Sequence, residues 1–286
     1  LLTFQAGRDA SRPALGADRQ RCPVCARQRQ STPLAGYRDV VERLPGGEYR
    51  PCAVIHDSVS GTAVDRASGA TRAGSAYTLP ALAAGTRLMG YVTTGVDSAA
   101  AIRDELLPAG RELRVGGGRS RGLGLVRVTF CDDPRAPATL PLEERIAGMQ
   151  RRFDALVGAV QNPASWRYVG VTLLADAILL DPFFRFRASL EPDDLGAAGL
   201  TLVHQAGDTV AVGGWNAATG LPKERAIAVR RGSSFLYQYR HEDHDTVVAA
   251  LAVAERCGVG ERRAEGLGRI RVSDPFHWEV HDLWQS

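Results

Sequence analysis

The chain has 286 residues, enough for two domains, and a hydrophobic content of 44% that can build a sizeable core. Its net charge of +3 does not by itself mark a nucleic-acid-binding protein, and its five cysteines do not form a disulfide framework. Because we recognise no run of about 18 apolar residues and no secretion signal, we expect a cytoplasmic protein without a membrane span. The sequence opens with Leu1 in mid-pattern, so we expect further residues, a first strand among them, to precede it.

The first 50 residues are rich in Arg, Pro, Gly and Gln and lack periodicity, which predicts an insertion at about 8–50. Within it, Cys22 and Cys25 form a C-x-x-C motif with the spacing of a zinc knuckle. A complete site needs two more ligands, and Cys52 and His56 are the nearest candidates. A redox motif would need a thioredoxin-like βαβ context, which is absent. Structural zinc and two unliganded thiols therefore remain as alternatives.

Strand and turn patterns dominate the chain up to residue 135. Short strands are expected at 53–56, 76–79 and 85–92, with a polar turn region at 61–72. Ser98 is the expected N-cap of a helix that carries Ile102, Leu106 and Leu107 on its apolar face. A glycine-rich loop at 115–124 follows that helix and leads into a strand at 125–130.

A linker helix is predicted within 136–164. Pro141 opens it, and Glu143 and Glu144 lie in its first turn, where acidic side chains complement the helix dipole. Apolar residues then recur at helical spacing and indicate a face that packs into a core: Leu142, Ile146, Met149, Phe153, Leu156 and Val160.

The region 165–286 repeats this mixture of strands and a helix. A long apolar strand is expected at 168–180, with others at 184–190, 200–204, 226–229 and 232–239. Asp245 is the expected cap of a helix that Gly258 closes. A second glycine-rich loop at 258–268 then precedes a last strand at 269–272.

The two halves share an order of parts, which indicates an internal duplication. Each has a polar turn, at 65–69 and at 216–220, and each ends with a glycine-rich loop and a strand. Mixed strands and helices of this kind are typical of a ferredoxin-like βαββαβ unit. The sequence therefore predicts an α+β protein with two tandem ferredoxin-like domains, at 1–135 and 165–286, joined by the helix at 136–164.

The glycine-rich loops also resemble those of a known superfamily, the RAMP proteins of CRISPR systems (repeat-associated mysterious proteins). The loop at 258–268 matches the family pattern G-h-G-x-x-x-x-x-G-h-G at every glycine, and 116–124 looks like a shortened copy. The segment 65–77 resembles the D-R-x-x-G-x-A segment of type III effector subunits. From about residue 20 onward, the chain looks most like the two-domain RAMP subunit (Csx type) of subtype III-D.

This resemblance implies a non-catalytic, RRM-like subunit of a type III CRISPR effector complex in antiviral defence, one that holds the 5′ handle region of the crRNA. The implied partners are crRNA, target RNA, other RAMP subunits and the large subunit of the complex. Members of the family often carry a C-P-x-C element near their start, which favours zinc at Cys22 and Cys25, with Cys52 as a further candidate ligand.

RNA that is bound through its backbone needs arginines, exposed N–H groups and stacking aromatics. The expected RNA-binding residues come from the two loops and from the polar turn regions. They are Arg66, Arg72, Arg119, Arg121, Trp215, Lys223, Gly258, Gly260, Arg262, Arg263, Gly266 and Gly268. Tyr77 is a further stacking candidate.

A metal-independent RAMP endoribonuclease, which processes precursor crRNA or cuts target RNA, is the alternative function. Its candidate catalytic residues are His56 and Asp65, although Asp65 corresponds to Asn216 in the second half and so has a turn-forming interpretation. A scaffold that contacts only protein is a third hypothesis. No nucleophile elbow, zinc-protease motif or P-loop lysine is present.

Overall fold

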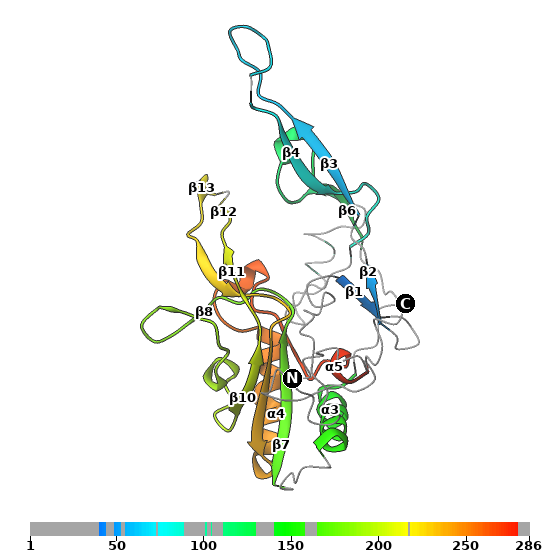
Figure 1. Ribbon diagram of the computed structural model, residues 1–286, viewed down its shortest axis with the longest axis vertical. Helices are drawn as coiled ribbons and strands as arrows, with labels where there is room; N and C mark the ends of the chain where they lie inside the picture. The colour runs from blue at the N-terminus through cyan, green and yellow to red at the C-terminus, as the bar shows by residue number, and fades with distance from the viewer. Residues whose placement is uncertain are drawn as a thin grey trace, which may run out of the picture. The chain divides into compact units, whose positions relative to one another are not determined.

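The computed structural model describes residues 40–43, 49–52, 55–72, 74–88, 101, 104, 111–129, 140–157, 165–216 and 218–279. The chain is of the mixed α+β class and consists mostly of small antiparallel sheets with few helices (Figure 1). It divides into two compact units. Unit 1 comprises Leu1–Ala53 and Ala138–Ser286, and unit 2 comprises Val54–Pro137.

A four-stranded sheet forms the centre of unit 1. Its strands are β7 (Trp166–Leu173), β10 (Thr201–Ala206), β15 (Ser234–Arg240) and β16 (Ile270–Val272). They lie in the order β10-β15-β7-β16, and every neighbouring pair is antiparallel. The sheet therefore places strands that are distant in the chain next to one another, with β7 and β15 in the middle.

Helix α3 (Leu142–Val157) packs against β7, so the helix expected as a linker belongs to the core of unit 1. The predicted apolar face is confirmed where the structure describes it, because Ile146, Met149 and Phe153 are buried. Phe153 stacks on Tyr168 at 3.9 Å between ring centroids. Gly170 leaves room for Met149, since a Cβ on this glycine would lie 2.9 Å from the methionine Cε.

A buried ion-pair network ties α3 to the helix α4 (His244–Cys257) and to β16. Both Glu255 carboxylate oxygens accept from Arg145 Nη2, at 3.0 and 2.9 Å, and Arg271 Nη1 donates to the same carboxylate at 3.0 Å. Arg145 also donates to the backbone carbonyls of Leu140 and Val272. The Arg145 side chain is buried, so these bonds are what offsets the loss of its hydration.

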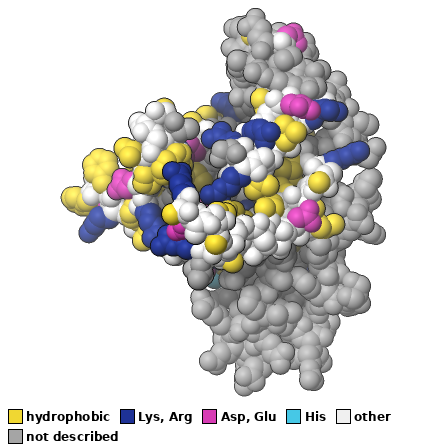
Figure 2. Space-filling model, turned by 90° about the horizontal axis from the view of Figure 1, so that it is seen from above, with side chains coloured by type: hydrophobic (Ala, Val, Ile, Leu, Met, Phe, Trp, Pro, Cys, Tyr) yellow, Lys and Arg dark blue, Asp and Glu magenta, His cyan; other side chains and the backbone are white. Residues whose placement is uncertain are grey.

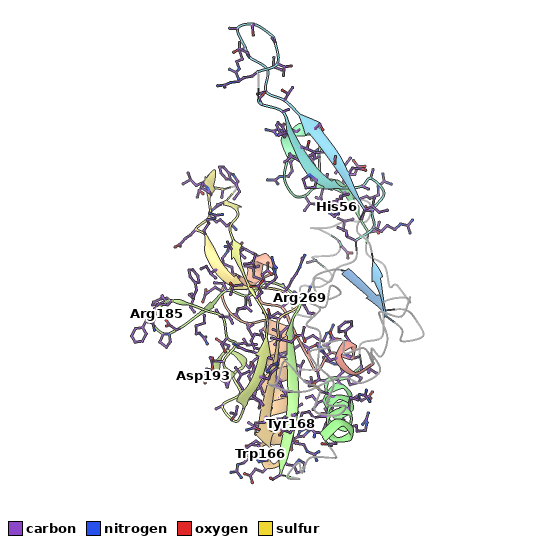
Figure 3. The ribbon with its side chains drawn as sticks, viewed as in Figure 1. His56, Trp166, Tyr168, Arg185, Asp193 and Arg269 are labelled. Atoms are coloured by element: carbon purple, nitrogen blue, oxygen red, sulfur yellow. The ribbon has the colours of Figure 1, made fainter. Side chains whose placement is uncertain are left out.

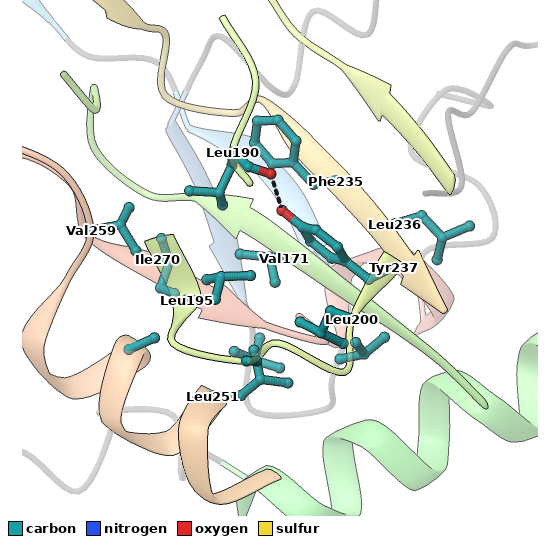
Figure 4. Close-up of a cluster of buried hydrophobic side chains, with 14 of the residues drawn as sticks. Val171, Leu190, Leu195, Leu200, Phe235, Leu236, Tyr237, Leu251, Val259 and Ile270 are labelled. Carbon is teal, nitrogen blue, oxygen red and sulfur yellow. Dashed lines mark hydrogen bonds between the residues drawn. The ribbon is translucent and has the colours of Figure 1, made fainter. Parts of the chain in front are cut away.

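The hydrophobic core lies between the sheet and the elements that cover it (Figure 4). Tyr237 is fully buried, and its hydroxyl donates to the Leu190 carbonyl at 2.6 Å. Burial raises the pKa of the Tyr237 hydroxyl well above its ordinary value. His277, in α5 (Phe276–Glu279), is also buried and forms a 2.7 Å hydrogen bond with Thr172 Oγ1.

Small antiparallel strand pairs complete unit 1. They are β1 (Val40–Arg43) with β2 (Tyr49–Cys52), β8 (Leu179–Leu180) with β9 (Phe186–Arg187), β11 (Thr209–Val212) with β14 (Ala226–Val229), and β12 (Trp215–Asn216) with β13 (Leu221–Pro222). Short 3-10 helices are η3 (Pro192–Leu195), η4 (His241–Asp243) and η5 (Arg263–Glu265).

Unit 2 consists of two antiparallel strand pairs in its described part. β3 (His56–Gly61) pairs with β4 (Tyr77–Leu82), and β5 (Arg111–Arg114) pairs with β6 (Leu125–Val128). The 3-10 helix η2 (Arg119–Arg121) lies in the loop between β5 and β6. Among the described residues of the whole chain, no helix is long and apolar enough to span a membrane.

Five expectations for the elements were wrong. The strand expected at 85–92 is absent from its described part, 85–88, and the segment 184–190 contains only the two-residue strand β9. The apolar run 168–180 is not one strand, because β7 ends at Leu173 and the chain bends before β8. Helix α4 begins at His244, and its cap residue is Asp243 rather than Asp245. The first glycine-rich loop follows a strand, β5, rather than a helix. Gly258 does close α4, with its N–H donating to the Ala254 carbonyl at 2.8 Å.

Candidate nucleic-acid interface

The two glycine-rich loops have the same length and the same backbone conformation. We call residues 115–124 loop 1 and residues 259–268 loop 2; both read V-G-x-x-R-x-x-G-L-G. Each contains a 3-10 turn at the same place, η2 in loop 1 and η5 in loop 2. A backbone hydrogen bond joins the first and last residues of each loop. It runs from Val115 N to Gly124 O at 2.9 Å in loop 1 and from Val259 N to Gly268 O at 2.8 Å in loop 2. Over these ten residues loop 1 repeats the backbone of loop 2. It is shortened only in that Arg114 stands where Gly258 precedes loop 2, so the first glycine of the family pattern is missing, as expected.

The last glycine of each loop is required by its close contact with the start of the loop. Gly124 has φ 76° and Gly268 has φ 70°, conformations that other residues adopt only with strain. A Cβ on Gly124 would collide with the Val115 carbonyl oxygen, and one on Gly268 with that of Val259. The glycines thus close both loops tightly, and Gly258 caps a helix, so their first role is to set the backbone.

Long hairpins form the second repeated feature. Hairpin 1 comprises residues 56–82, and hairpin 2 comprises residues 209–229. Their tips are matching turns: Asp65 Oδ1 accepts from the N–H groups of Ala67 and Ser68, and Asn216 Oδ1 accepts from those of Ala218 and Thr219. These contacts confirm the predicted correspondence of Asp65 and Asn216. They also lower the pKa of Asp65, chiefly through the backbone N–H of Ser68.

A basic residue follows the tip at the same position in both hairpins. Arg72 N donates to the Ala63 carbonyl, and Lys223 N donates to the Gly214 carbonyl, each at 2.9 Å. The bridge just before them is also equivalent, joining Val64 to Thr71 in one hairpin and Trp215 to Pro222 in the other. The duplication predicted from the order of parts therefore extends to individual backbone contacts.

Loop 2 and hairpin 2 meet through an ion cluster centred on Glu265. Arg262 Nη2 lies 2.5 Å from Glu265 Oε2, and Lys223 Nζ lies 2.9 Å from Glu265 Oε1. Arg262 Nη2 also donates to the Gly213 carbonyl at 3.3 Å. The hydrogen bond from Arg262, followed by that from Lys223, lowers the pKa of Glu265 to about 2. Two of the cations expected to bind RNA are thus already paired with a carboxylate.

Loop 1 has a different charge at the corresponding positions. Arg121 stands where loop 2 has Glu265, and its Nη1 donates to the Tyr77 hydroxyl at 2.8 Å. The Arg121 guanidinium also lies over the Tyr77 ring, 5.4 Å from its centroid. Loop 1 carries two arginines and no carboxylate, whereas loop 2 carries two arginines and two glutamates. Loop 1 is consequently the more positive of the two.

One arginine is presented in the same way by both loops. Arg119 and Arg263 are the first residues of η2 and η5, and both are exposed. Within the described part of the chain, neither guanidinium has a hydrogen bond or ion pair. Arg269, which follows loop 2, is exposed as well and lies at the opposite end of the sheet from Trp166 (Figure 3).

The remaining expected contact residues are also on the surface. Arg66 and Arg72 are exposed in the tip of hairpin 1, and Trp215 is 62% exposed in hairpin 2. Tyr77 is 38% exposed and is engaged by Arg121. Figure 2 shows Lys and Arg side chains spread over the described part of the face that it draws, with Asp and Glu side chains among them.

The candidate catalytic residues do not converge in the described structure. His56 is exposed at the start of β3, opposite Leu82, and no other described side chain hydrogen-bonds to it. Asp65 uses one carboxylate oxygen to hold the hairpin tip together. General acid–base catalysis needs groups that converge on the nucleophile and the leaving group of one scissile bond, and among the described residues no hydrogen bond joins His56 to a second titratable side chain.

The predicted zinc ligands lie largely outside the described residues. Cys22 and Cys25 are both in the undescribed N-terminal part, and for Cys52 only the backbone in β2 is described. Among the described residues, no group of three or more His, Cys, Asp and Glu side chains is placed to hold a metal ion. Zinc at this motif stays a prediction.

Two features that decide the charge of this surface were not predicted from the sequence. Arg269 was missed because it stands next to the last strand and was read as part of it. The neutralising role of Glu265 was missed because Lys223 is distant from it in the chain. Only the matching V-G-x-x-R-x-x-G-L-G register of the loops, visible in the printed sequence, could have singled out Arg119 and Arg263 as equivalents.

No protein-family model matches the sequence, and no curated protein matches it. The resemblance described above therefore rests on the residues alone.

Proposed function

We propose that the chain is a non-catalytic crRNA-binding subunit of a type III CRISPR RNA-guided interference complex, and that it holds the 5′ handle region of the crRNA. The observation that carries the proposal is the equivalent placement of Arg119 and Arg263. Each is exposed on a rigid, glycine-closed loop, and each lacks an ion-pair partner among the described residues. Unpaired cations on rigid loops suit binding to a phosphate backbone, which is where sequence-independent affinity for RNA originates.

The architecture of unit 1 supports the same proposal. The strand order β10-β15-β7-β16 with antiparallel neighbours, and α4 connecting β15 to β16, agree with a ferredoxin-like βαββαβ unit. The 3-10 helix η3 lies in the connection between β7 and β10, where such a unit has its first helix. The repeated loop and hairpin in unit 2 extend this proposal to two tandem domains.

The test is binding of the purified chain to a labelled single-stranded CRISPR repeat RNA, with EDTA present. We expect salt-sensitive binding without cleavage. The double variant Arg119→Ala/Arg263→Ala should make the slope of log affinity against log salt concentration shallower. The expected change is about 0.7 for each lost phosphate contact, which is about 1.4 in total. The matched control is Arg151→Ala, an exposed arginine of α3 remote from the loops in sequence.

The outcomes separate the candidate functions. Specific cleavage of the repeat RNA that is lost in His56→Ala would indicate that the protein is the endoribonuclease instead. Absence of RNA binding by the folded wild-type chain would leave the protein-only scaffold and refute the proposal. Zinc binding is tested independently. We expect the purified protein to contain about one zinc ion per chain. The double variant Cys22→Ser/Cys25→Ser should contain none.

A further inference from the structure

The β8–β9 hairpin carries two phenyl rings that the core does not use. We call residues 179–187 the aromatic hairpin. At its tip, the side chains of Phe183 and Phe184 are 76% and 83% exposed, while Leu179 at its base is fully buried. The tip extends away from the sheet (Figure 1), and Arg185 is labelled beside it in Figure 3. Neighbouring phenyl rings with so much exposed surface are favoured only if something else covers them.

The tip is held rigidly although it packs against little. Asp181 Oδ1 accepts from the backbone N–H groups of Phe183 and Arg185, at 2.8 and 2.9 Å. Phe184 N donates to the Asp181 carbonyl, and Asp181 N to the Arg185 carbonyl, each at 2.9 Å. At the base, Arg187 Nη2 donates to both carboxylate oxygens of Asp194, at 2.8 and 3.0 Å. A rigid tip loses little conformational entropy when it binds, which favours affinity.

The backbone at Phe184 makes its side chain costly for folding. Its φ of 61° lies in the left-handed region, where a bulky residue is rare and where Gly or Asn is favoured. A phenyl ring at this position contributes nothing to the core, because it is the most exposed of the large hydrophobic side chains among the described residues. A Phe in a strained, exposed position indicates a role outside the folded chain itself.

The charge of the hairpin indicates what covers it. Arg185 is paired with Asp181 at 2.7 Å and lies over the Phe183 ring, and Arg187 is paired with Asp194. The aromatic hairpin therefore offers no unpaired cation among its described residues, in contrast to loop 1. A single-stranded nucleic acid would need such cations beside the stacking rings. An apolar pocket needs only the rings and a rigid support.

We propose that the aromatic hairpin is a docking element that inserts Phe183 and Phe184 into an apolar pocket on a partner protein. Buried aromatic anchors of this kind commonly dominate the affinity of protein interfaces. The inference does not rest on RNA binding, because the hairpin residues are separate from the loop arginines and a variant of one set leaves the other intact.

The test is photo-crosslinking of the full chain in the organism that encodes it. p-Benzoylphenylalanine replaces Phe184, and in a matched control it replaces Leu221, an apolar residue of β13 that is 62% exposed. We expect one ribonuclease-resistant protein adduct at position 184 that is absent at 221. The protein identified in this adduct, once purified, should bind the chain at least about 30-fold more weakly in Phe183→Ser/Phe184→Ser.

Several results would overturn the inference: an adduct that ribonuclease destroys, no adduct beyond that of the control, or partner binding unchanged in the double variant. The variant Phe184→Asn separates folding from docking. It should melt at or above the wild-type temperature, since Asn tolerates the left-handed conformation, and bind the partner more weakly. RNA affinity should be unchanged in both hairpin variants.

Discussion

Glu265 is the residue whose replacement tests the charge balance of the proposed RNA surface most specifically. Its carboxylate holds Arg262 at 2.5 Å and Lys223 at 2.9 Å, so it occupies two cations that would otherwise be available to phosphates. Loop 1 has Arg121 at the equivalent position. We therefore expect Glu265→Gln to strengthen RNA binding, because the amide keeps the shape of the side chain and removes its charge.

The size of the effect follows from the number of cations released. Each phosphate contact on a single strand contributes about 0.7 to the slope of log affinity against log salt concentration. Releasing Arg262 and Lys223 should steepen this slope by up to about 1.4. Between 0.05 and 0.2 M salt, the affinity of the variant should then fall about 7-fold more than that of the wild type.

Fluorescence anisotropy of a labelled repeat RNA, titrated at several KCl concentrations, measures both quantities. Glu261→Gln is the matched control, because Glu261 is exposed in the same loop and no ion pair engages it within the described structure. It should change the slope much less than Glu265→Gln. An unchanged or shallower slope in Glu265→Gln, with the fold intact, would instead mean that the carboxylate positions the two cations for RNA and does not compete with it.

Three further predictions concern the structure that supports the site. Burial lowers the pKa of His277 to about 3, whereas the unfolded chain binds this proton near pH 6.5, so the free energy of unfolding should rise with pH in between. This histidine should account for about 3 kcal/mol between pH 4 and 7, and urea titrations of His277→Gln should show that much less pH dependence. Arg145→Met leaves the Glu255 carboxylate with one partner fewer in a half-buried site, and urea unfolding should show a loss of about 3 kcal/mol; an unchanged midpoint would refute the role given to this network. Gly268→Ala should lower thermal stability more than Gly266→Ala, because both have positive φ but only the first new Cβ meets a backbone atom; equal losses would contradict the account.

Local patterns predicted the features that depend on neighbouring residues in the chain. The apolar spacing of α3 is such a pattern, and so is the turn chemistry shared by Asp65 and Asn216. The closing of α4 by Gly258 was likewise predicted from its place after the apolar helical pattern. In each case the interaction spans only a few residues, so sequence spacing and structural distance agree.

Features set by distant contacts were not predictable in the same way. The apolar run 168–180 looks continuous, yet its chain turns at Asp176, whose backbone carbonyl accepts from Gly268 and whose carboxylate accepts from Arg231. The pairing of Lys223 with Glu265 depends on hairpin 2 folding back onto loop 2. The strand β5 before loop 1 was missed because its Arg-Glu-Leu-Arg sequence lacks the β-branched residues that mark strands.

Contact between RNA and the two equivalent loops can be measured by crosslinking with a 4-thiouridine-substituted repeat RNA. After digestion, mass spectrometry identifies the peptides that carry a nucleotide adduct. We expect adducts on the peptides that contain loops 1 and 2, with the loop 1 adduct the stronger because that loop carries no carboxylate. RNA adducts confined to other parts of the chain, with both loops unmodified, would contradict this expectation.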